Sequence, residues 1–453
     1  MSRRFFILSV TLGALAVASL SFASDVSVTV YNSNLGVVHE TRSLEFDQGI
    51  GRVSFADVPS RIDPTSVGFD LIDRSGSVTI LEQNYAYDLV SPEKIYSKYI
   101  DNRIDIFDKE GNAFSGRLLS FAGGSFVIQN DNGRIRIVRT EQVTNADFPE
   151  LPEGLITRPT LFWLYSSTFA GRADCEVSYQ TGGLSWSAEY VGILSEDEKR
   201  LHLTGWSSIQ NNSGATYKDA SLKLVAGDIH RAAPPSGRGR FEMADLSMAK
   251  APSAAFEEKE FFEYHLYTLP RKATLADNEI KQIALFDPAT TEVTKEYYYE
   301  PDKNRQDVRV AIRFENADDK GLGLPLPKGR ARVFKADTDG SMILLGEDRI
   351  DHTPRNEEIK MTVGYAFDLA AEYQVIDFTK ISSRVEENTH EIKLRNHKEE
   401  DVIVIVEKII GGDWEIIETT HEFEKKKANT IEFRLPVRAD GETTLVFKVR
   451  TKR

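Results

Sequence analysis

The sequence contains a single cysteine, Cys175, among its 453 residues. One cysteine cannot form a disulfide within the chain, so the burial of apolar side chains alone must hold the fold together. Residues 173–177 around it have a β-like pattern, and no histidine lies nearby in the sequence. We therefore interpret Cys175 as a small buried hydrophobic residue rather than a catalytic nucleophile.

An excess of positive charge is also missing. Lys and Arg total 56 against 70 Asp and Glu, which leaves a formal net charge of -14. A chain this acidic repels the phosphate backbone, so we expect no nucleic-acid partner. The hydrophobic content of 41% is high enough for packed cores and argues against general disorder. The length predicts two to four domains.

Long apolar runs are absent beyond the first residues. Arg3 and Arg4 precede an apolar run over residues 5–20, and small residues follow at 21–23. This order is typical of a signal peptide over residues 1–23, cleaved before Ser24, and a retained N-terminal anchor is the alternative. No later stretch is apolar enough to cross a bilayer. We expect export to the periplasm or beyond the cell, with no transmembrane segment after signal removal.

Local catalytic motifs are missing as well. The eight histidines form no metal-binding pair, and the chain has neither a nucleophile elbow nor a phosphate-binding loop. Residues 337–341 place oxygen donors at alternate positions, but a hairpin turn explains them better than a calcium loop. We predict no catalytic, cofactor-binding or metal-binding residues and favour a role other than catalysis. Carboxylates brought together only by the fold would still permit a hydrolase.

Strand patterns dominate what is present. Val26, Val28 and Val30 alternate with polar residues, and similar short runs recur to the end of the chain. We predict an all-β protein of several β-sandwich and β-barrel modules with very little helix. The predicted N-terminal β domain covers residues 24–90. Residues 91–150 are predicted to form a short helix, capped by Ser91, followed by a small SH3-like barrel.

The remaining residues, 155–453, are predicted to be a β-sandwich region. Residues 231–258 are rich in Ala, Pro, Ser, Gly and charge, which predicts a long mobile loop. A β-prone segment follows at 261–267 and could accept a partner strand by β-augmentation, unless it is paired internally. Turn signals near the C-terminus predict an immunoglobulin-like sandwich over residues 380–453.

Aromatic residues form the most distinctive cluster. Trp186 and Tyr190 share strand parity, so they project from one face of a predicted strand. With Trp206, Tyr264 and Tyr267 they are the candidate binding surface for a sugar or a peptide. The alternative, which we favour, is that these aromatics belong to the core of a sandwich.

Several motifs carry a family resemblance. They occupy residues 179–186, 203–206, 211–227, 263–267 and 323–329. Residues 155–453 resemble the bacterial family called domain of unknown function 4139. Mucoidy-inhibitor-like relatives, linked by name to exopolysaccharide production, carry a coiled coil ahead of the shared domain. The small barrel predicted at 91–150 departs from that pattern, and the resemblance supplies no catalytic residues.

These observations favour an exported, non-catalytic protein of the cell envelope that binds or scaffolds through its β modules. Its expected partner is an envelope protein or glycan, with no cofactor. Two alternatives remain: a hydrolase acting on envelope glycan or peptide, and a structural subunit that associates with itself.

Overall fold

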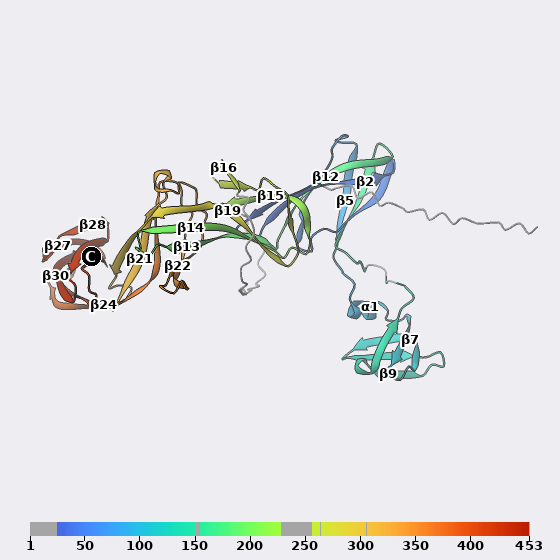
Figure 1. Ribbon diagram of the computed structural model, residues 1–453. Helices are drawn as coiled ribbons and strands as arrows, with labels where there is room; N and C mark the ends of the chain where they lie inside the picture. The colour runs from blue at the N-terminus through green and yellow to red at the C-terminus, as the bar shows by residue number, and fades with distance from the viewer. Residues whose placement is uncertain are drawn as a thin grey trace, which may run out of the picture. The chain divides into compact units, whose positions relative to one another are not determined.

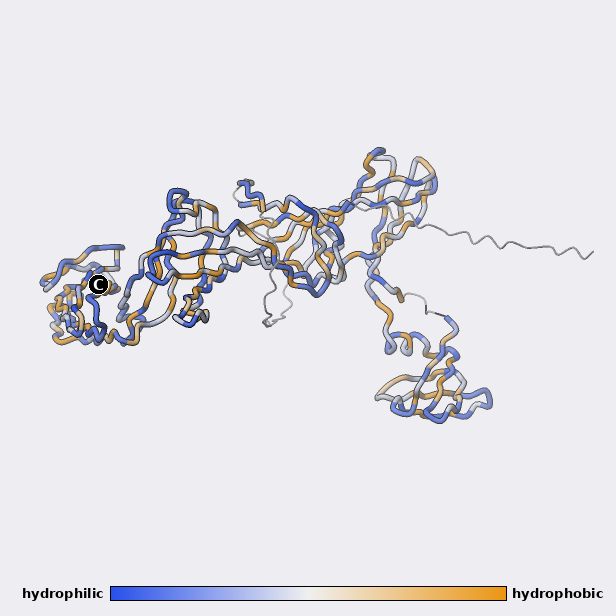
Figure 2. The backbone as a smooth tube through the Cα atoms, viewed as in Figure 1, coloured by the Kyte–Doolittle hydropathy of each residue, from blue (hydrophilic) through white to orange (hydrophobic). Residues whose placement is uncertain are grey.

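The computed structural model describes residues 25–150, 152, 155–227, 256–262, 264–304 and 306–452. It is 67% strand and 3% helix and contains several β modules, which confirms the predicted all-β class. Residues 1–23, predicted as a signal peptide, lie outside the described part. None of the helices in the described part is long and apolar enough to span a membrane. Figure 2 shows hydrophilic and hydrophobic residues interspersed along the strands, as two-faced sheets require.

The described residues fall into two units. The first contains Val37–Thr181, and the second contains Val28–Gly36 and the described residues after Thr181. The first unit begins with a sandwich of two small sheets. One sheet has the order β2 (Gly36–Phe46), β12 (Gly171–Thr181), β4 (Ile62–Leu71), and the other has the order β3 (Gly49–Ala56), β11 (Thr160–Ser167), β5 (Val78–Ala86).

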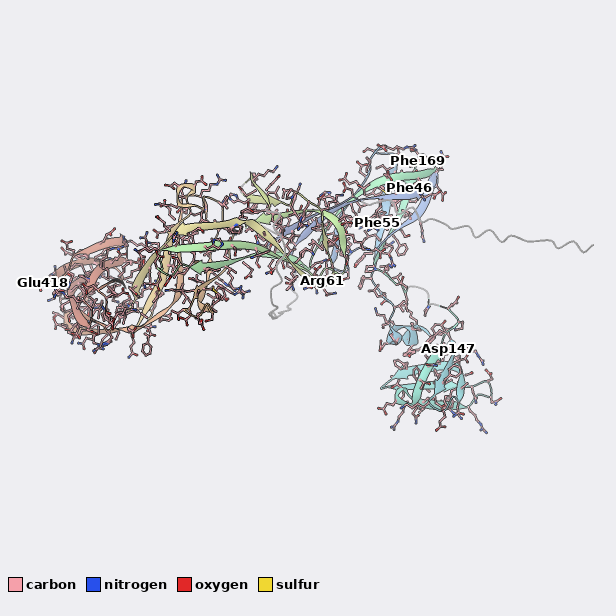
Figure 3. The ribbon with its side chains drawn as sticks, viewed as in Figure 1. Phe46, Phe55, Arg61, Asp147, Phe169 and Glu418 are labelled. Carbon is pink, nitrogen blue, oxygen red and sulfur yellow. The ribbon has the colours of Figure 1, made fainter. Side chains whose placement is uncertain are left out.

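The core of this N-terminal sandwich is aromatic. Phe46 and Tyr165 meet edge to face with ring centroids 5.0 Å apart, and Figure 3 labels Phe46 close to Phe169. Cys175 belongs to the same core, where burial raises the pKa of its thiol to about 11. This confirms Cys175 as a buried hydrophobic residue.

The predicted boundaries of this domain need correction. The prediction ended the N-terminal domain at residue 90 and began the family region at 155. In the structure, β11 lies between β3 and β5 and pairs with both, so residues 160–167 complete the N-terminal sandwich. A strand that returns after a long insertion has no local sequence signal that reveals its partners.

The insertion contains the one α-helix in the described residues. Helix α1 (Pro92–Lys98) begins where the sequence predicts it, and the hydroxyl of Ser91 accepts a hydrogen bond from the N–H of Lys94 (3.4 Å). Five strands follow in the order β10 (Val143–Asp147), β6 (Arg103–Asp108), β7 (Ala113–Ala122), β8 (Ser125–Gln129), β9 (Ile135–Arg139). Strands β6 and β10, the first and last of this module in sequence order, are therefore neighbours in the sheet. The 3-10 helix η1 (Thr140–Gln142) joins β9 to β10. The module has its own apolar core, which includes Ile106 and Phe126.

The second unit opens with a small group of strands. Their order is β16 (Glu257–Phe261), β17 (Tyr264–Thr268), β15 (Tyr217–Ala226), β1 (Val26–Tyr31), and β18 (Ala273–Leu275) also pairs with β15. Of the loop predicted at 231–258, residues 231–255 lie outside the described part of the chain. Its predicted end is wrong, because β16 already begins at Glu257. The predicted continuous strand 261–267 is instead a hairpin that turns at Phe262, whose φ is +57°.

A five-stranded sheet forms the middle of the unit. Its order is β19 (Glu279–Glu292), β14 (Arg200–Asn211), β13 (Leu184–Leu194), β22 (Gly329–Ala336), β23 (Met342–Ile350), with β13 and β22 parallel (Figure 1). The predicted hairpin turn at 337–341 is confirmed between β22 and β23, where Gly340 has a φ of +85°. Every second residue of β13 is buried and the residues between them are mostly half-buried, so one face of this strand packs against the core more closely than the other.

Nine strands form the C-terminal sheet. Their order is β27 (Asp413–Thr419), β30 (Gly441–Lys452), β25 (Val385–Asn396), β24 (Glu358–Lys380), β21 (Asp307–Glu315), β20 (Thr294–Tyr299), β26 (Val402–Ile409), β29 (Thr430–Val437), β28 (Phe423–Lys427). Strand β24 pairs first with β21 and then with β25. The sheet thereby folds over into two layers, and Phe433 and Phe447 from different layers meet with centroids 5.2 Å apart.

The predicted start of this sandwich at residue 380 is also wrong. Tyr297, Tyr299 and Val308 share its apolar core, so the sandwich draws on residues from 294 onward. Residue 380 is the last residue of β24 rather than a domain boundary. The 23 residues of β24 alternate poorly between polar and apolar, because the strand serves two different neighbours along its length.

Candidate functional site

Three of the five predicted site residues are core residues. Trp186, Tyr190 and Tyr267 are at most 4% exposed. The indole N–H of Trp186 donates to the carbonyl of Val225 (3.0 Å), and the hydroxyl of Tyr190 donates to that of Pro327 (2.7 Å). The prediction of a binding surface is therefore wrong for these three residues. The shared strand parity of Trp186 and Tyr190 directs both inward, because that face of β13 is the buried one.

The other two predicted residues are half-buried. Trp206 lies on the opposite face of the same sheet, across from Glu189 on β13. Tyr264 begins β17, which pairs with β15 on one side and β16 on the other. Since both edges of β17 are occupied, this strand is not available for the β-augmentation considered above. The structure therefore does not bring the five aromatics together into one surface.

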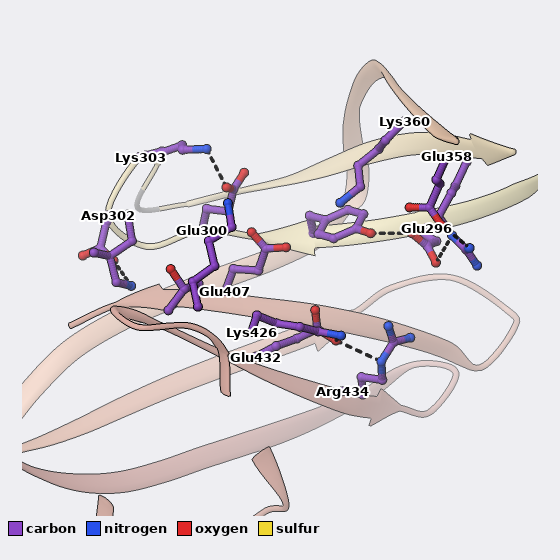
Figure 4. A pocket seen from close by; sticks show the side chains of 15 residues that line it. Glu296, Glu300, Asp302, Lys303, Glu358, Lys360, Glu407, Lys426, Glu432 and Arg434 are labelled. Carbon is purple, nitrogen blue, oxygen red and sulfur yellow. Dashed lines mark hydrogen bonds and ion pairs between the residues drawn. The ribbon is translucent and has the colours of Figure 1, made fainter. Parts of the chain in front are cut away.

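A charged cleft lies on the C-terminal sandwich. It has a volume of about 610 Å³ and lies on the outer face of the layer that contains β20, β26 and β29 (Figure 4). Six acidic and six basic side chains line it: Glu296, Glu300, Asp302, Glu358, Glu407, Glu432, Lys303, Arg313, Lys360, Lys426, Lys427 and Arg434. The cleft as a whole therefore carries no net formal charge.

Tyr298 on β20 lines the cleft. Its side chain packs with Ala311 and Ile405, and its hydroxyl donates a hydrogen bond to Glu296. Burial and the Glu296 carboxylate raise the pKa of Tyr298 well above its usual value, so the phenol stays protonated. The ammonium of Lys360 lies 3.9 Å from the centre of the ring, close enough for a cation–π contact.

On one wall of the cleft, the carboxylate of Glu300 forms ion pairs with two cations. Glu300 accepts from Lys303 (2.7 Å) and from Arg309 (3.0 Å). Partial burial acts to raise the pKa of Glu300, but these two cations outweigh it, and the pKa lies below its usual value. Glu300 is therefore ionised at neutral pH and is unsuited to act as a general acid.

Three carboxylates lie in a row across β26, β29 and β28, and two of them, Glu407 and Glu432, line the cleft. Glu407 on β26 lies directly opposite Glu432 on β29, and Glu432 lies opposite Glu424 on β28. Opposed side chains on neighbouring strands have Cβ atoms about 5 Å apart, so this row is repulsive unless cations join it. Lys426 pairs with Glu424 (2.9 Å), and Arg434 lies 3.0 Å from Glu432.

Glu407 is the member of the row without a cation. Among the described residues it has no hydrogen-bond or ion-pair partner, and it is only partly buried. Neither Lys427 nor Lys360 has an ion-pair partner among the described residues, and the ammonium of Lys360 lies over the ring of Tyr298. The cleft thus presents one free carboxylate and two free ammonium groups within a frame of paired charges. Such a frame can bind a ligand that carries charges of both signs.

Comparison of the chain with protein-family models finds no match, and comparison with curated proteins finds none either. Within the described residues, no group of three or more His, Cys, Asp or Glu side chains is placed to hold a metal ion.

The sequence alone did not predict the cleft. Its residues come from β20, β21, β24, β26, β28 and β29 and from neighbouring turns, and are spread from 296 to 434. A local signal exists in residues 430–435, where Glu432 and Arg434 alternate with buried apolar residues. That alternation predicts a strand with a charged outer face, but it cannot say which other strands lie beside it.

Proposed function

We propose that this protein is an exported, non-catalytic binding protein of the cell envelope, and that the cleft of its C-terminal sandwich is the binding site. Export to the periplasm or beyond the cell is supported by the signal-like pattern at residues 1–23. Membership of the domain of unknown function 4139 family is part of the proposal and is supported only by the motifs quoted above.

The observation that carries the proposal is the set of charged side chains in the cleft that have no ion-pair partner among the described residues. Glu407 can bind a cation, while Lys360 and Lys427 can bind anions, and the paired charges around them hold the walls in place. A protein segment with acidic and basic side chains in close succession offers both signs at side-chain spacing. We therefore favour an envelope protein as partner over a glycan.

The test is a partner capture with matched charge variants. Purified protein is incubated with an envelope extract, and bound material is identified by mass spectrometry. Glu407→Lys places a third free cation among Lys360 and Lys427 and should reduce the captured partner by about tenfold or more, since one tenfold step needs only ~1.4 kcal/mol. The control is Glu415→Lys on β27, an exposed glutamate outside the cleft.

Equal capture by both variants and the unmodified protein would exclude the cleft as the binding site. Capture of a glycan in place of a protein would retain the site and change the ligand class. Capture of nothing specific by the unmodified protein would count against the binding function itself.

A hydrolase is the second candidate, and the facing carboxylates of Glu407 and Glu432 are the observation that favours it. Two carboxyl groups across a scissile bond are the usual arrangement in glycoside hydrolysis. Release of soluble fragments from purified envelope glycan or peptide, abolished in both Glu407→Gln and Glu432→Gln, would establish this activity. No release by the unmodified protein would leave binding as the function of the cleft.

A further inference from the structure

The five-stranded module inserted into the N-terminal sandwich has an unpaired edge at β9. The strand order of this module ends with β9, which pairs with β8 alone among the described strands. One side of β9 therefore presents backbone N–H and C=O groups that no strand of the described chain satisfies. Such an edge can accept an extended peptide as a further strand, whereas both edges of β17 are already occupied.

The side chains along this edge are unusual for an acidic chain. Residues 134–139 are, in order, Arg-Ile-Arg-Ile-Val-Arg, and all three arginines are exposed. None of the three has an ion-pair partner among the described residues, although the whole sequence carries a net charge of -14. Exposed cations close together repel one another, so they favour a ligand that supplies negative charge.

The alternation of residues gives β9 two different faces. Successive side chains of a strand point to opposite faces, so Ile135 and Ile137 share one face while Arg134 and Arg136 share the other. The two isoleucines are 62% and 68% exposed. Charged residues commonly protect an edge strand against unwanted pairing, but exposed isoleucines beside them work against that protection. We therefore interpret the combination as a recognition surface.

A groove of about 490 Å³ borders β9, which lines it together with Phe114 on β7 and the turn at 108–110. The guanidinium of Arg136 lies 4.7 Å from the centre of the Phe114 ring, and this cation–π contact holds the cation at the groove. The carboxylate of Asp108 accepts hydrogen bonds from the backbone and side-chain amides of Asn112 (2.8 and 2.9 Å). Asp108 is therefore engaged within its own turn, and the charge of Arg136 remains available to a ligand.

We propose that β9 binds an extended segment of a partner protein in which acidic and apolar residues alternate. The segment adds to the edge as a further strand, so that its backbone pairs with the backbone of β9. Opposed residues on neighbouring strands project to the same face, so its acidic side chains lie by Arg134 and Arg136 and its apolar ones by Ile135 and Ile137. Glu141 follows β9 and also lines the groove, which places the acidic part of the segment at the Arg134 end.

A peptide fits this surface better than a nucleic acid does. A phosphate backbone would use the arginines but leave both isoleucines in water, and the acidic remainder of the chain would repel it. An alternating peptide uses the charges, the apolar face and the backbone edge together. The site shares no residue with the cleft of the C-terminal sandwich, so it does not depend on the function proposed above.

Fluorescence polarisation with synthetic peptides and the full chain tests the proposal. The probe is a labelled peptide of alternating glutamate and valine, and the comparison peptide has lysine in place of each glutamate. Only the acidic peptide should bind, and Arg136→Glu should raise its dissociation constant by about tenfold or more. Arg172→Glu, which changes an exposed arginine on β12 outside the module, is the matched control and should leave the dissociation constant unchanged.

Backbone methylation separates strand pairing from charge attraction alone. Two further acidic peptides carry N-methyl groups either on every glutamate or on every valine. Alternate residues of a strand direct their N–H groups to the same edge, so one of these two peptides should lose binding while the other retains it.

The proposal is overturned if the acidic peptide does not bind, if Arg136→Glu leaves its affinity unchanged, or if both methylated peptides bind equally. Tighter binding of single-stranded DNA than of the peptide would assign β9 to a nucleic acid instead. Glu407→Lys should leave peptide binding unchanged, and a loss of binding in that variant would move the peptide to the cleft.

Discussion

Replacement of Asn211 should strongly destabilise the middle sheet. This side chain is 1% exposed at the end of β14, and its amide N–H₂ donates to the carbonyls of Ala215 (2.9 Å), Leu275 (3.1 Å) and Ala276 (3.1 Å). Its amide oxygen accepts from the backbone N–H of Ser213 (3.1 Å). Asn211→Ala leaves these backbone groups without partners in a buried place. At ~1–3 kcal/mol for each unsatisfied group, and with some relaxation toward water, we expect a loss of about 2–4 kcal/mol.

Native-state hydrogen exchange read by mass spectrometry measures this loss on peptides from β13, β14 and β15. The matched control is Asn212→Ala, one residue along, whose side chain forms no hydrogen bond among the described residues. We expect the control to change stability by less than about 0.5 kcal/mol. Asn211→Asp should be at least as damaging as Asn211→Ala, because an acceptor oxygen would then face the three carbonyls. If Asn211→Ala also falls within about 0.5 kcal/mol of the unmodified protein, the argument that this side chain anchors the strand end is wrong.

Three further predictions concern the C-terminal sandwich and its junction with the middle sheet. Phe447→Ala should lower the free energy of unfolding by about 3–5 kcal/mol in urea melts, since the ring is fully buried against Phe433. Gly346→Ala should cost about 1–3 kcal/mol, because the new methyl group would overlap the carbonyl of Val363, and differential scanning calorimetry should show a lower Tm. Burial lowers the pKa of His390 from 6.5 to about 4, with Lys408 adding to the effect, so the folded state holds the neutral ring. The unfolded state binds the proton first, and stability should therefore fall by up to roughly 3 kcal/mol as the pH drops from 6.5 to 4. Urea melts between pH 4 and pH 6.5 measure this loss of stability. A His390→Phe variant should lose the part of the pH dependence that His390 causes.

Local sequence patterns predicted several elements correctly. The alternation of Val26, Val28 and Val30 predicts β1, and a serine followed by proline and glutamate predicts the start of α1. The turn at Gly340 followed from residues that favour a left-handed conformation. In each case the residues that determine the structure lie within a few positions of one another, so a single sequence is enough to predict it.

Module boundaries could not be predicted in the same way. The sequence predicts a domain boundary at the linker near residue 150, but β11 returns to pair with β3 and β5. Strand β24 pairs with β21 and then with β25, which moves the start of the C-terminal sandwich from residue 380 to 294. Both errors concern strand pairing over long sequence separations.

The sequence by itself determined the all-β class, the positions of most strands and the absence of an internal disulfide, because these depend on composition and on side chains close together in the chain. Only the tertiary structure decided which face of each strand is inside. It buried Trp186 and Tyr190 and left Trp206 on the opposite face. It also brought Glu296, Glu407 and Glu432 into one cleft. The physical reason is that a strand has two faces and two edges, and its neighbours in the sheet, which can lie anywhere in the chain, decide which of them stays exposed.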